Sequence, residues 1–395
     1  MLKKISTNQL KLGMFIHELH CSWMDHPFMR NQFVLSEAND IVKVKKAGIK
    51  QITIDISKGL DVDKPDSTST VVTARTSTAK PDKKITSNPD IDHRLQSSKK
   101  LVAKASQIAK KILGDVSAGH EVDMEATEST VSQITQMIDK DPHTLVGVSR
   151  IKTKDEYTFM HCVSVCALMT AFAQYLGYSK EEIDEISTGA LLHDIGKALT
   201  PLEILNKPGK LTDEEFVIMK QHAVTRETKL LDNCGLSEKA LDVVSMHHER
   251  PDGKGYPLGL KGDELTEVGK MSAIVDIYDA LTSVRVYKSA WEPSEALKNM
   301  LSWCPHQLDT ALTQKFIKML GVYPVGSLVL LKSGLVGIVI EPGEKMLRPV
   351  LKIIYNANGR HYVEVKQMDL SKYPKESIKQ PISPSSYKIE MAKFI

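Results

Sequence analysis

The sequence predicts a mainly α-helical protein, with a helical core domain between a small N-terminal α+β domain and a small C-terminal β appendage. Three observations lead to this expectation. Short apolar runs of strand length occur in residues 1–57 and again in residues 322–395, whereas apolar residues recur at helical spacing in residues 98–321. Residues 58–97 are mostly polar and predict a flexible linker.

The N-terminal domain is predicted from β-branched and aromatic residues in runs such as Met14–Ile16, Phe33–Leu35 and Ile52–Ile54. A regulatory or oligomerising role for it is a hypothesis. The following segment contains Asp63–Thr70, which is polar and has no aromatic residue. Such a segment buries too little apolar surface to offset its ordering entropy, so a domain boundary is expected here.

Several residues of the N-terminal domain superficially resemble a metal site, namely His17, His20, Cys21 and His26. Their spacing matches no structural zinc pattern, and no second pair of ligands follows at the expected interval. We therefore interpret them as ordinary core or surface residues. The five cysteines of the chain are an odd and scattered set, which indicates free thiols rather than a disulfide framework.

The core domain is predicted to be helical because Leu101, Ile108 and Ile112 fall on one helix face. The same periodicity returns later in the domain. Two capping boxes, Ser179–Glu182 and Thr212–Glu215, mark further helix starts.

The C-terminal appendage is predicted to be a small sheet. Strand-like runs occupy Val329–Leu331, Val336–Ile340 and Val350–Tyr355. Asn358-Gly359 is a hairpin turn signal that leads to the run Tyr362–Val365.

The bulk properties exclude several classes of protein. The 395 residues carry a net charge of +3, which is too small to indicate nucleic-acid binding. An apolar fraction of 42% with 26% charged residues is typical of a globular protein. No signal peptide and no membrane-spanning run is recognised, so a cytoplasmic protein without DNA or membrane partners is expected.

The chemistry of the core domain is predicted from an adjacent histidine and aspartate within the apolar segment Gly189–Lys197. A buried carboxylate beside an imidazole is costly unless it is paired or bound to a metal. One such pair occurs often by chance. Here, however, a set of histidines and aspartates lies on or at the ends of separate apolar helices: His161, His193, Asp194, His222, His247, His248 and Asp276.

This set suits two divalent metal ions such as iron, manganese, nickel or zinc. Two metals roughly 3.5–4 Å apart can activate a water molecule and stabilise the leaving oxygen of a phosphoryl displacement. A carboxylate is the natural bridging ligand. Lys197 would bring positive charge towards a phosphate, although a solvated lysine at a helix end is an alternative interpretation.

The sequence around these residues resembles the HD-GYP domain, a subgroup of the HD phosphohydrolase superfamily. The resemblance rests on His193-Asp194 and on the segment His247–Pro257, with support from Lys207–Thr212 and Tyr278–Ser283. It covers roughly residues 150–320. The N-terminal residues are similar to a small uncharacterised domain often found ahead of HD-GYP domains.

The resemblance implies a helical HD-type bundle and a metal-dependent phosphodiesterase that opens a cyclic dinucleotide, cyclic di-GMP or 3′3′-cyclic GMP-AMP. The seven residues above would be the metal ligands, with Asp194 as the bridge and Lys197 on the scissile phosphate. The loop Gly255-Tyr256-Pro257 would lie beside the site, and Arg285 and Lys288 would hold the substrate phosphates. Iron or manganese would be the metals, with nickel, zinc and magnesium left open.

One position departs from the family pattern. Some members have a glutamate four residues before the first histidine that binds a third metal, and this position is Tyr157 here. Glu156 would point about 100° away on a helix. The sequence therefore predicts two metals rather than three.

Two other functions stay open at this point. The protein could be a phosphohydrolase of linear nucleotides, or a signalling adaptor that binds cyclic dinucleotide or diguanylate cyclases (GGDEF proteins) through its glycine-rich loop. The complete set of ligands and the long loop motif favour the phosphodiesterase. The preferred cyclic dinucleotide and the formation of a homodimer are left open.

Overall fold

The structure is a computed structural model that describes residues 2–19, 33–35, 38–46, 49, 51–62, 89–149, 157–207, 209–224, 230–283, 290–387, 389–391 and 394. The chain forms two compact units. The smaller unit contains residues 1–82 and takes in 288–291, and the larger unit contains residues 83–287 and 292–395. The predicted mainly α-helical class, with small sheets towards both ends of the chain, is confirmed.

The smaller unit is an antiparallel sheet in the order β1-β4-β2-β3 with one helix. Its elements are β1 (Leu2–Ser6), β2 (Phe15–Leu19), β3 (Phe33–Val34), α1 (Ala38–Lys46) and β4 (Gln51–Asp55). The three predicted strand runs are confirmed. The sequence did not indicate β1, because two lysines interrupt this edge strand and leave it without an apolar run.

Of the histidines and cysteine set aside in this unit, His17 lies on β2. His20, Cys21 and His26 are outside the described residues.

The larger unit begins with a helical bundle. Its longer helices are α2 (Pro89–Ser117), α3 (Met124–Lys140), α4 (Pro142–Ser149), α5 (Tyr157–Leu176), α6 (Lys180–Leu192), α8 (Asp213–Lys220), α9 (Glu238–Met246), α10 (Glu267–Thr282), α11 (Pro293–Ser302) and α12 (Thr310–Leu320). Helix α2 starts at Pro89, so helical structure begins before residue 97, the predicted end of the linker. Its first turns are polar, which hides them from a search for apolar periodicity.

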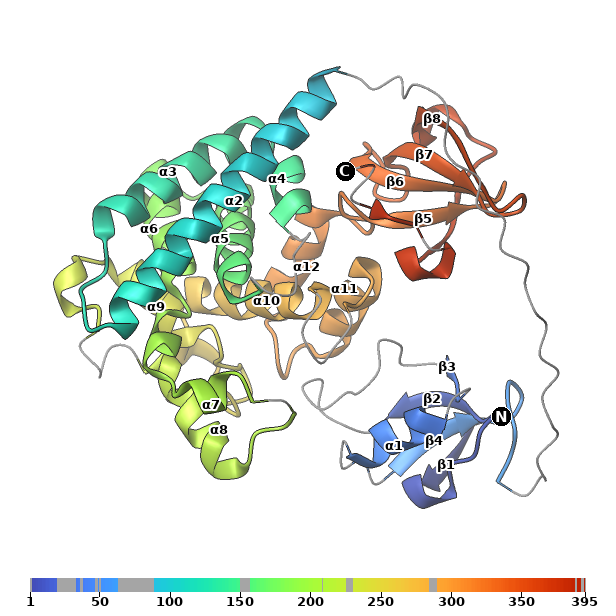
Figure 1. Cartoon of the computed structure of the whole chain (residues 1–395), viewed down its shortest axis with the longest axis horizontal. Coiled ribbons are helices and arrows are strands. Elements are labelled where there is room, and N and C mark those ends of the chain that lie inside the picture. Colours follow the sequence, from blue (N-terminus) through green and yellow to red (C-terminus); the bar gives the residue numbers. More distant parts are fainter. Residues whose placement is uncertain are drawn as a thin grey trace. The chain divides into compact units, whose positions relative to one another are not determined.

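Helix α5 runs through the bundle and packs against α2, α3, α4, α6 and α10 (Figure 1). Residues Thr158–Leu176 are long and apolar enough to span a membrane, but 78% of this stretch is buried inside the protein. A helix that is apolar all round and surrounded by other helices is a core helix. It therefore gives the bundle a rigid centre.

The predicted capping boxes at Ser179 and Thr212 are both present and start α6 and α8. Helix α6 approaches α9 closely at Gly189, where a Cβ atom would come within 2.5–3.0 Å of the backbone of Ala240. The missing side chain allows the two helices to meet there. Both helices end in residues of the predicted metal site, so this contact helps to set the distance between them.

The bundle is followed by an antiparallel sheet in the order β8-β7-β6-β5-β9. Its strands are β5 (Leu328–Leu331), β6 (Leu335–Glu341), β7 (Val350–Asn356), β8 (His361–Asp369) and β9 (Ile378–Pro381). The predicted turn at Asn358-Gly359 joins β7 to β8 and is confirmed. Strand β9 was not predicted, because it is a short edge strand with a polar middle and a proline at its end.

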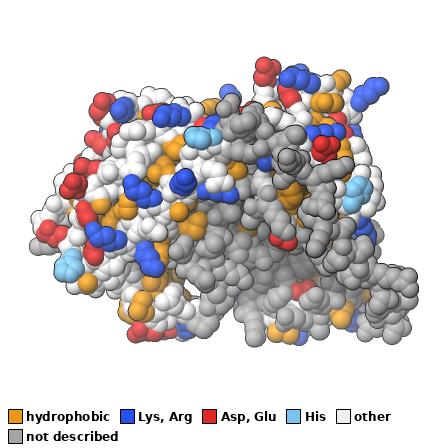
Figure 2. All heavy atoms as spheres, turned by 45° about the horizontal axis from the view of Figure 1, so that its top comes forward, with side chains coloured by type: hydrophobic (Ala, Val, Ile, Leu, Met, Phe, Trp, Pro, Cys, Tyr) orange, Lys and Arg blue, Asp and Glu red, His pale blue; other side chains and the backbone are white. Residues whose placement is uncertain are grey.

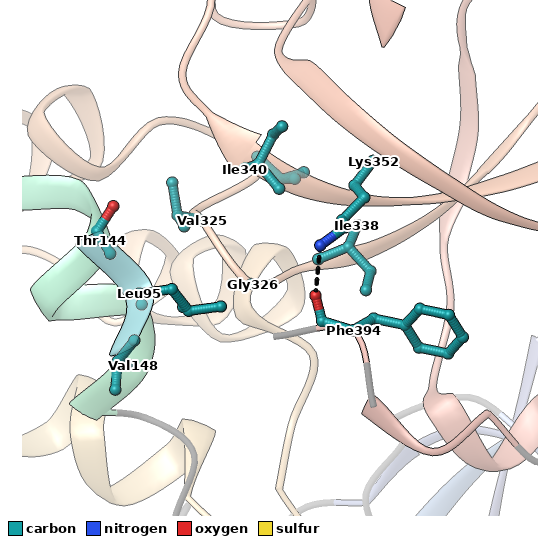
Figure 3. Close-up of a pocket in the computed structure, with 11 residues that line it drawn as sticks. Leu95, Thr144, Val148, Val325, Gly326, Ile338, Ile340, Lys352 and Phe394 are labelled. Atoms are coloured by element: carbon teal, nitrogen blue, oxygen red, sulfur yellow. Dashed lines mark hydrogen bonds between the residues drawn. The ribbon is translucent and has the colours of Figure 1, made fainter. Parts of the chain in front are cut away.

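The sheet and the bundle meet through α2 and α4. Arg94 forms ion pairs of 3.0 Å with both Asp141, at the end of α3, and Glu341 of β6. Leu95, which follows Arg94 on α2, and other apolar side chains from the two parts line a cavity of about 40 Å³ (Figure 3). Lys352 closes one side by donating a hydrogen bond to the carbonyl of Phe394.

The surface of the helical part carries both signs of charge. Lysines and arginines lie interspersed with carboxylates on the face seen in Figure 2. This distribution agrees with the small net charge of the chain.

We expect Gly189→Ala to lower the free energy of unfolding by about 1–3 kcal/mol, because the added methyl group meets backbone atoms of α9. Gly114→Ala is the matched control. Gly114 is exposed within α2, a Cβ atom there would meet nothing within 4 Å, and alanine should raise stability by about 0.5–1 kcal/mol. Urea unfolding followed by circular dichroism measures both. Equal stability of Gly189→Ala and the native protein would contradict the close approach.

Candidate metal centre

The structure brings the seven predicted ligands together from five places in the chain. His161 lies on α5, His193 and Asp194 follow α6, His222 lies in the short helix Gln221–Ala223, His247 and His248 follow α9, and Asp276 lies on α10. Groups of these residues offer ligand atoms within 4.8 Å of one another. Six of the side chains are at most 7% exposed, and only that of His248, at 23%, is more open.

Three of the histidines share one local arrangement. The Nδ1 atoms of His193, His222 and His247 lie 2.8, 2.6 and 2.7 Å from the backbone carbonyl three residues earlier. A carbonyl oxygen can only accept, so each Nδ1 carries the proton and each Nε2 carries a lone pair. The helix end thus fixes both the orientation and the tautomer of each ring, as metal-binding histidines require.

The carboxylate of Asp194 lies between two groups of imidazoles. Its Oδ2 atom is 3.5 Å from Nε2 of His193 and 3.7 Å from Nε2 of His161. Its Oδ1 atom is 3.5 Å from Nε2 of His222 and 3.8 Å from Nε2 of His247. Oδ1 is buried and has no hydrogen-bond partner. A buried oxygen of this kind is costly unless a cation satisfies it.

The imidazoles also approach one another through their Nε2 atoms. Nε2 of His193 is 3.3 Å from Nε2 of His161, and Nε2 of His222 is 3.4 Å from that of His247 and 3.2 Å from that of His248. Nε2 of His222 and Nε2 of His247 both carry lone pairs, and two lone pairs cannot form a hydrogen bond with each other. A cation between them removes this repulsion, and since imidazoles lie on both sides of Asp194, the donor set fits a divalent metal ion on each side.

Asp276 adds a second carboxylate to the cluster. Its Oδ1 atom is 3.0 Å from Nε2 of His161, and its Oδ2 atom is 3.6 Å from Nδ1 of His248. His161 is held from its other side by Asp279, whose Oδ2 atom lies 2.6 Å from Nδ1. Asp279 in turn accepts a hydrogen bond from the hydroxyl of Ser164.

Burial sets the charge of most of these groups. It lowers the pKa of His222 and of His247 to about 4, and it lowers the pKa of His193 and His248 as well. Burial would raise the pKa of Asp194, but Lys197 and the surrounding histidines hold it well below its usual range. At neutral pH these residues are therefore neutral imidazoles and an ionised carboxylate, which are the forms that bind metals.

His161 and Asp276 form a coupled pair within this set. Burial is the largest single influence and disfavours the charged form of each, but the hydrogen bond between them, together with the charges of neighbouring groups, outweighs it. These opposing influences lower the pKa of Asp276 well below its usual range, and together with the hydrogen bond to Asp279 they raise the pKa of His161. The pair holds one proton between two acceptors, at a place where a metal ion can replace that proton.

Lys197 lies on the more open side of the cluster. Its Nζ atom donates a hydrogen bond of 2.6 Å to Oδ2 of Asp194, and its side chain is 21% exposed. His248 is similarly exposed, at 23%. These two side chains mark the direction from which a substrate can reach the centre, and a phosphate contact by Lys197 stays a prediction.

The glycine-rich loop folds back onto the centre. Tyr256 donates its backbone N–H to the carbonyl of His248, and its ring lies 4.6 Å from the His248 ring. At Gly255 a Cβ atom would come within 2.5 Å of the backbone of Glu249, so only glycine fits there. Burial raises the pKa of Tyr256, which keeps its hydroxyl protonated as a hydrogen-bond donor.

Two buried carboxylates with structural roles were missed by sequence reasoning. Glu249 is 2% exposed and accepts hydrogen bonds from the backbone N–H groups of residues 258–260, which fixes the end of the loop. Asp279 positions His161, as described above. A signal for Asp279 existed, because it follows Asp276 by one helical turn within the same apolar helix.

The structure describes some of the remaining predicted residues and not others. Arg285 and Lys288, expected to hold the substrate phosphates, lie outside the described residues. Tyr157 is the first residue of α5. The loop residues Gly255, Tyr256 and Pro257 are described, and Tyr256 lies against the cluster.

Three known families match the chain along its length. Residues 2–127 match a domain of unknown function (DUF3391), residues 132–312 match the HD domain, and residues 328–390 match a KOW domain associated with the HD domain. The HD-domain match contains all seven residues of the cluster. It also contains the glycine-rich loop.

Curated relatives are bacterial phosphodiesterases. The cyclic di-GMP phosphodiesterase PA4108 of Pseudomonas aeruginosa is 37% identical over 94% of this chain and 90% of its own length. A cyclic di-GMP phosphodiesterase of Vibrio cholerae is 32% identical over 52% of this chain and 44% of its own length. The 3′3′-cGAMP-specific phosphodiesterase 2 of the same species is 33% identical over 38% of this chain and 29% of its own length.

Asp279→Asn is expected to weaken metal binding about 10–100-fold, the usual effect of losing a group that orients a ligand. The amide can donate to Nδ1 of His161, which would move the imidazole proton to Nε2 and block its lone pair. Metal content after dialysis against graded chelator measures the effect. Asp232→Asn, at an exposed position, is the control, and equal metal affinity of the two variants would contradict the positioning role of Asp279.

In the metal-free protein, the free energy of unfolding should fall as the pH is lowered from about 6.5 to 4. Burial lowers the pKa of His222 and His247 to about 4, whereas unfolded histidine has a pKa of about 6.5. Between these values the unfolded chain binds protons that the folded chain does not, so lower pH favours unfolding.

Urea unfolding at a series of pH values measures this dependence. His120→Gln changes an exposed histidine, and this variant should show the same pH dependence as the native protein. A midpoint that stays constant from pH 6.5 to 4 would contradict the neutral, buried state of the two rings.

Proposed function

This chain belongs to the HD-GYP group of HD-domain phosphodiesterases, and from that premise we propose that it hydrolyses a cyclic dinucleotide at a two-metal site around Asp194. The product is a linear dinucleotide. The relative that covers 94% of the chain acts on cyclic di-GMP, so cyclic di-GMP is the first substrate to test. 3′3′-Cyclic GMP-AMP is the second, because relatives that match over a shorter stretch of the chain are named as specific for it.

The observation that carries this proposal is the division of the Asp194 carboxylate between two groups of imidazoles. His161 and His193 lie on the side of Oδ2, and His222 and His247 lie on the side of Oδ1. A carboxylate placed in this way can serve two metal ions at once. A single metal ion would leave one of the two groups of imidazoles without a cation.

Two divalent ions held there would supply an activated water molecule and stabilise the leaving oxygen of the phosphodiester. The chain's own residues bind and orient the substrate. Lys197 lies at the open side, where its ammonium group can neutralise a phosphate oxygen. Tyr256 keeps its hydroxyl proton and can donate to the substrate. Asp279 accepts a hydrogen bond from Nδ1 of His161, so that Nε2 can bind a metal ion in place of the proton shared with Asp276.

We propose iron or manganese as the bound metals. The donors are imidazole nitrogens and carboxylate oxygens without a cysteine, a set that suits borderline divalent ions such as iron, manganese, nickel and zinc. The family pattern at position 157 supports two ions rather than three. Metal analysis of the protein purified without added metal tests both the identity and the number.

Other expectations about the protein stay predictions. A cytoplasmic location agrees with helix α5 being buried in the bundle. Binding of diguanylate cyclase (GGDEF) proteins through the glycine-rich loop can be tested by pull-down with purified cyclases. The formation of a homodimer can be tested by analytical ultracentrifugation.

The proposed activity is tested by incubating the protein with cyclic di-GMP or cyclic GMP-AMP, in the presence of Mn²⁺ or Fe²⁺ and under anaerobic reducing conditions. Chromatography of the products identifies linear dinucleotides. Cleavage of neither substrate would refute the proposal. Cleavage of linear nucleotides alone would instead favour a nucleotide phosphohydrolase.

Asp194→Asn should reduce the metal content by at least one ion per chain and lower turnover at least about 100-fold, because an amide nitrogen cannot bridge two metals. Metal analysis and product chromatography measure the two effects. Glu203→Gln, which alters an exposed carboxylate in the neighbouring turn, should change neither. Full activity in Asp194→Asn would show that this residue is not the bridge.

A further inference from the structure

An aromatic corner lies next to the open side of the metal centre. Phe216 of α8 meets Tyr256 of the glycine-rich loop, with ring centroids 6.0 Å apart and ring planes at 78°. Tyr256 packs on His248, the most exposed residue of the cluster. The corner is therefore one ring away from a predicted metal ligand.

A lysine points into this corner. The ammonium group of Lys220 lies 4.6 Å from the ring centre of Phe216 and 5.6 Å from that of Tyr256. Phe216 and Lys220 are four residues apart on α8, so helix geometry alone explains their contact. It does not explain the contact of Lys220 with Tyr256, which belongs to a different segment of the chain and lies against His248 of the metal centre.

Helix α8 contributes little to the core, since none of the side chains in Asp213–Lys220, all of which the structure describes, is buried. Phe216 is half-buried, whereas its neighbour Val217 is 57% exposed. A helix that is weakly packed but places an aromatic ring and a cation beside a reaction centre is suited to ligand binding rather than to stability.

We propose that Phe216, Tyr256 and Lys220 bind a guanine base of the substrate, an inference that rests on the proposed function. Any nucleic-acid base can stack on an aromatic side chain, so stacking alone does not distinguish one base from another. Guanine presents two acceptors, O6 and N7, along one edge, whereas adenine presents an acceptor beside an amino group. Lysine has donors only, so Lys220 favours guanine in the corner.

The corner then determines which cyclic dinucleotide is used. Both cyclic di-GMP and cyclic GMP-AMP contain a guanine that can occupy it, whereas cyclic di-AMP does not. The scissile phosphate of the same nucleotide would lie on the side of Lys197 and His248. Binding of the base and reaction at the phosphate thus involve separate residues.

The test compares Phe216→Leu and Lys220→Met with the native protein, using cyclic di-GMP, cyclic di-AMP and methyl 4-nitrophenyl phosphate, a phosphodiester without a base. Phe216→Leu should raise the KM for cyclic di-GMP about tenfold, the size of effect expected when one base loses its stacking partner. Lys220→Met should raise the KM for cyclic di-GMP about tenfold and the KM for cyclic di-AMP less than twofold. Metal content and turnover of the base-free diester should stay within twofold.

Val217→Ala and Lys180→Met are the matched controls, because the first truncates the exposed apolar neighbour of Phe216 on α8 and the second removes an exposed lysine at the start of α6. They should change neither the KM nor the turnover of any of the three substrates. Loss of metal, or equal loss of activity on the base-free diester, would overturn the proposal by showing that the corner only supports Tyr256 and His248. Equal changes for guanine and adenine substrates in Lys220→Met would overturn the role of Lys220.

A binding measurement separates this inference from the proposed function. The dissociation constants of GMP and AMP for the metal-loaded protein do not depend on turnover. Tighter binding of GMP that is lost in Lys220→Met would support the corner even if cyclic dinucleotides were not cleaved, in which case only the proposed function would fail. Equal affinities for GMP and AMP in the native protein would overturn the guanine preference.

Discussion

The arrangement of the helical domain depends on one buried carboxylate that is surrounded by acceptor atoms. Asp194 is 1% exposed, and its Oδ1 atom has no hydrogen-bond partner. Three of the imidazoles around it, those of His193, His222 and His247, present Nε2 lone pairs because their Nδ1 atoms donate to backbone carbonyls. Such a cluster is unfavourable without cations and favourable with them. The folded chain therefore holds these side chains in the orientation that divalent metal ions need.

The bundle supplies that orientation through helix ends and close helix contacts rather than through loops. His193 and His247 each follow the last turn of a helix, where the chain geometry places Nδ1 on a carbonyl three residues back. The two helices meet at Gly189, where no side chain separates them. His161 and Asp276 are buried residues within helices, so the packed helices hold their positions. A site built on rigid elements keeps its geometry before any ligand arrives.

The sequence predicted the ligand set and missed its supports, and the reason is physical. Ligands to two metals must be histidines and aspartates, and an unusual number of them on apolar helices is visible in the chain. Asp279 acts through His161, which is distant in the chain, and Glu249 acts through the backbone of residues 258–260, which come later in the chain. Carboxylates are common on surfaces, so the sequence gives no sign that Glu249 is buried, and only the place of Asp279 one turn after Asp276 in an apolar helix indicates its burial. The contact of Phe216 is likewise hidden in the sequence, because its partner Tyr256 follows 40 residues later.

The structure separates the part that performs the reaction from the part that selects the substrate. The metal centre is buried and rigid, so changes there alter the chemistry itself. Helix α8 and the glycine-rich loop lie at its open side and contribute few buried side chains. Substitutions on α8 can therefore change base preference at little cost in stability, because surface positions tolerate exchange. Cyclic di-GMP and 3′3′-cyclic GMP-AMP, the substrates for which relatives of this chain are named, both contain a guanine, so a guanine site on α8 would separate them from cyclic di-AMP but not from each other.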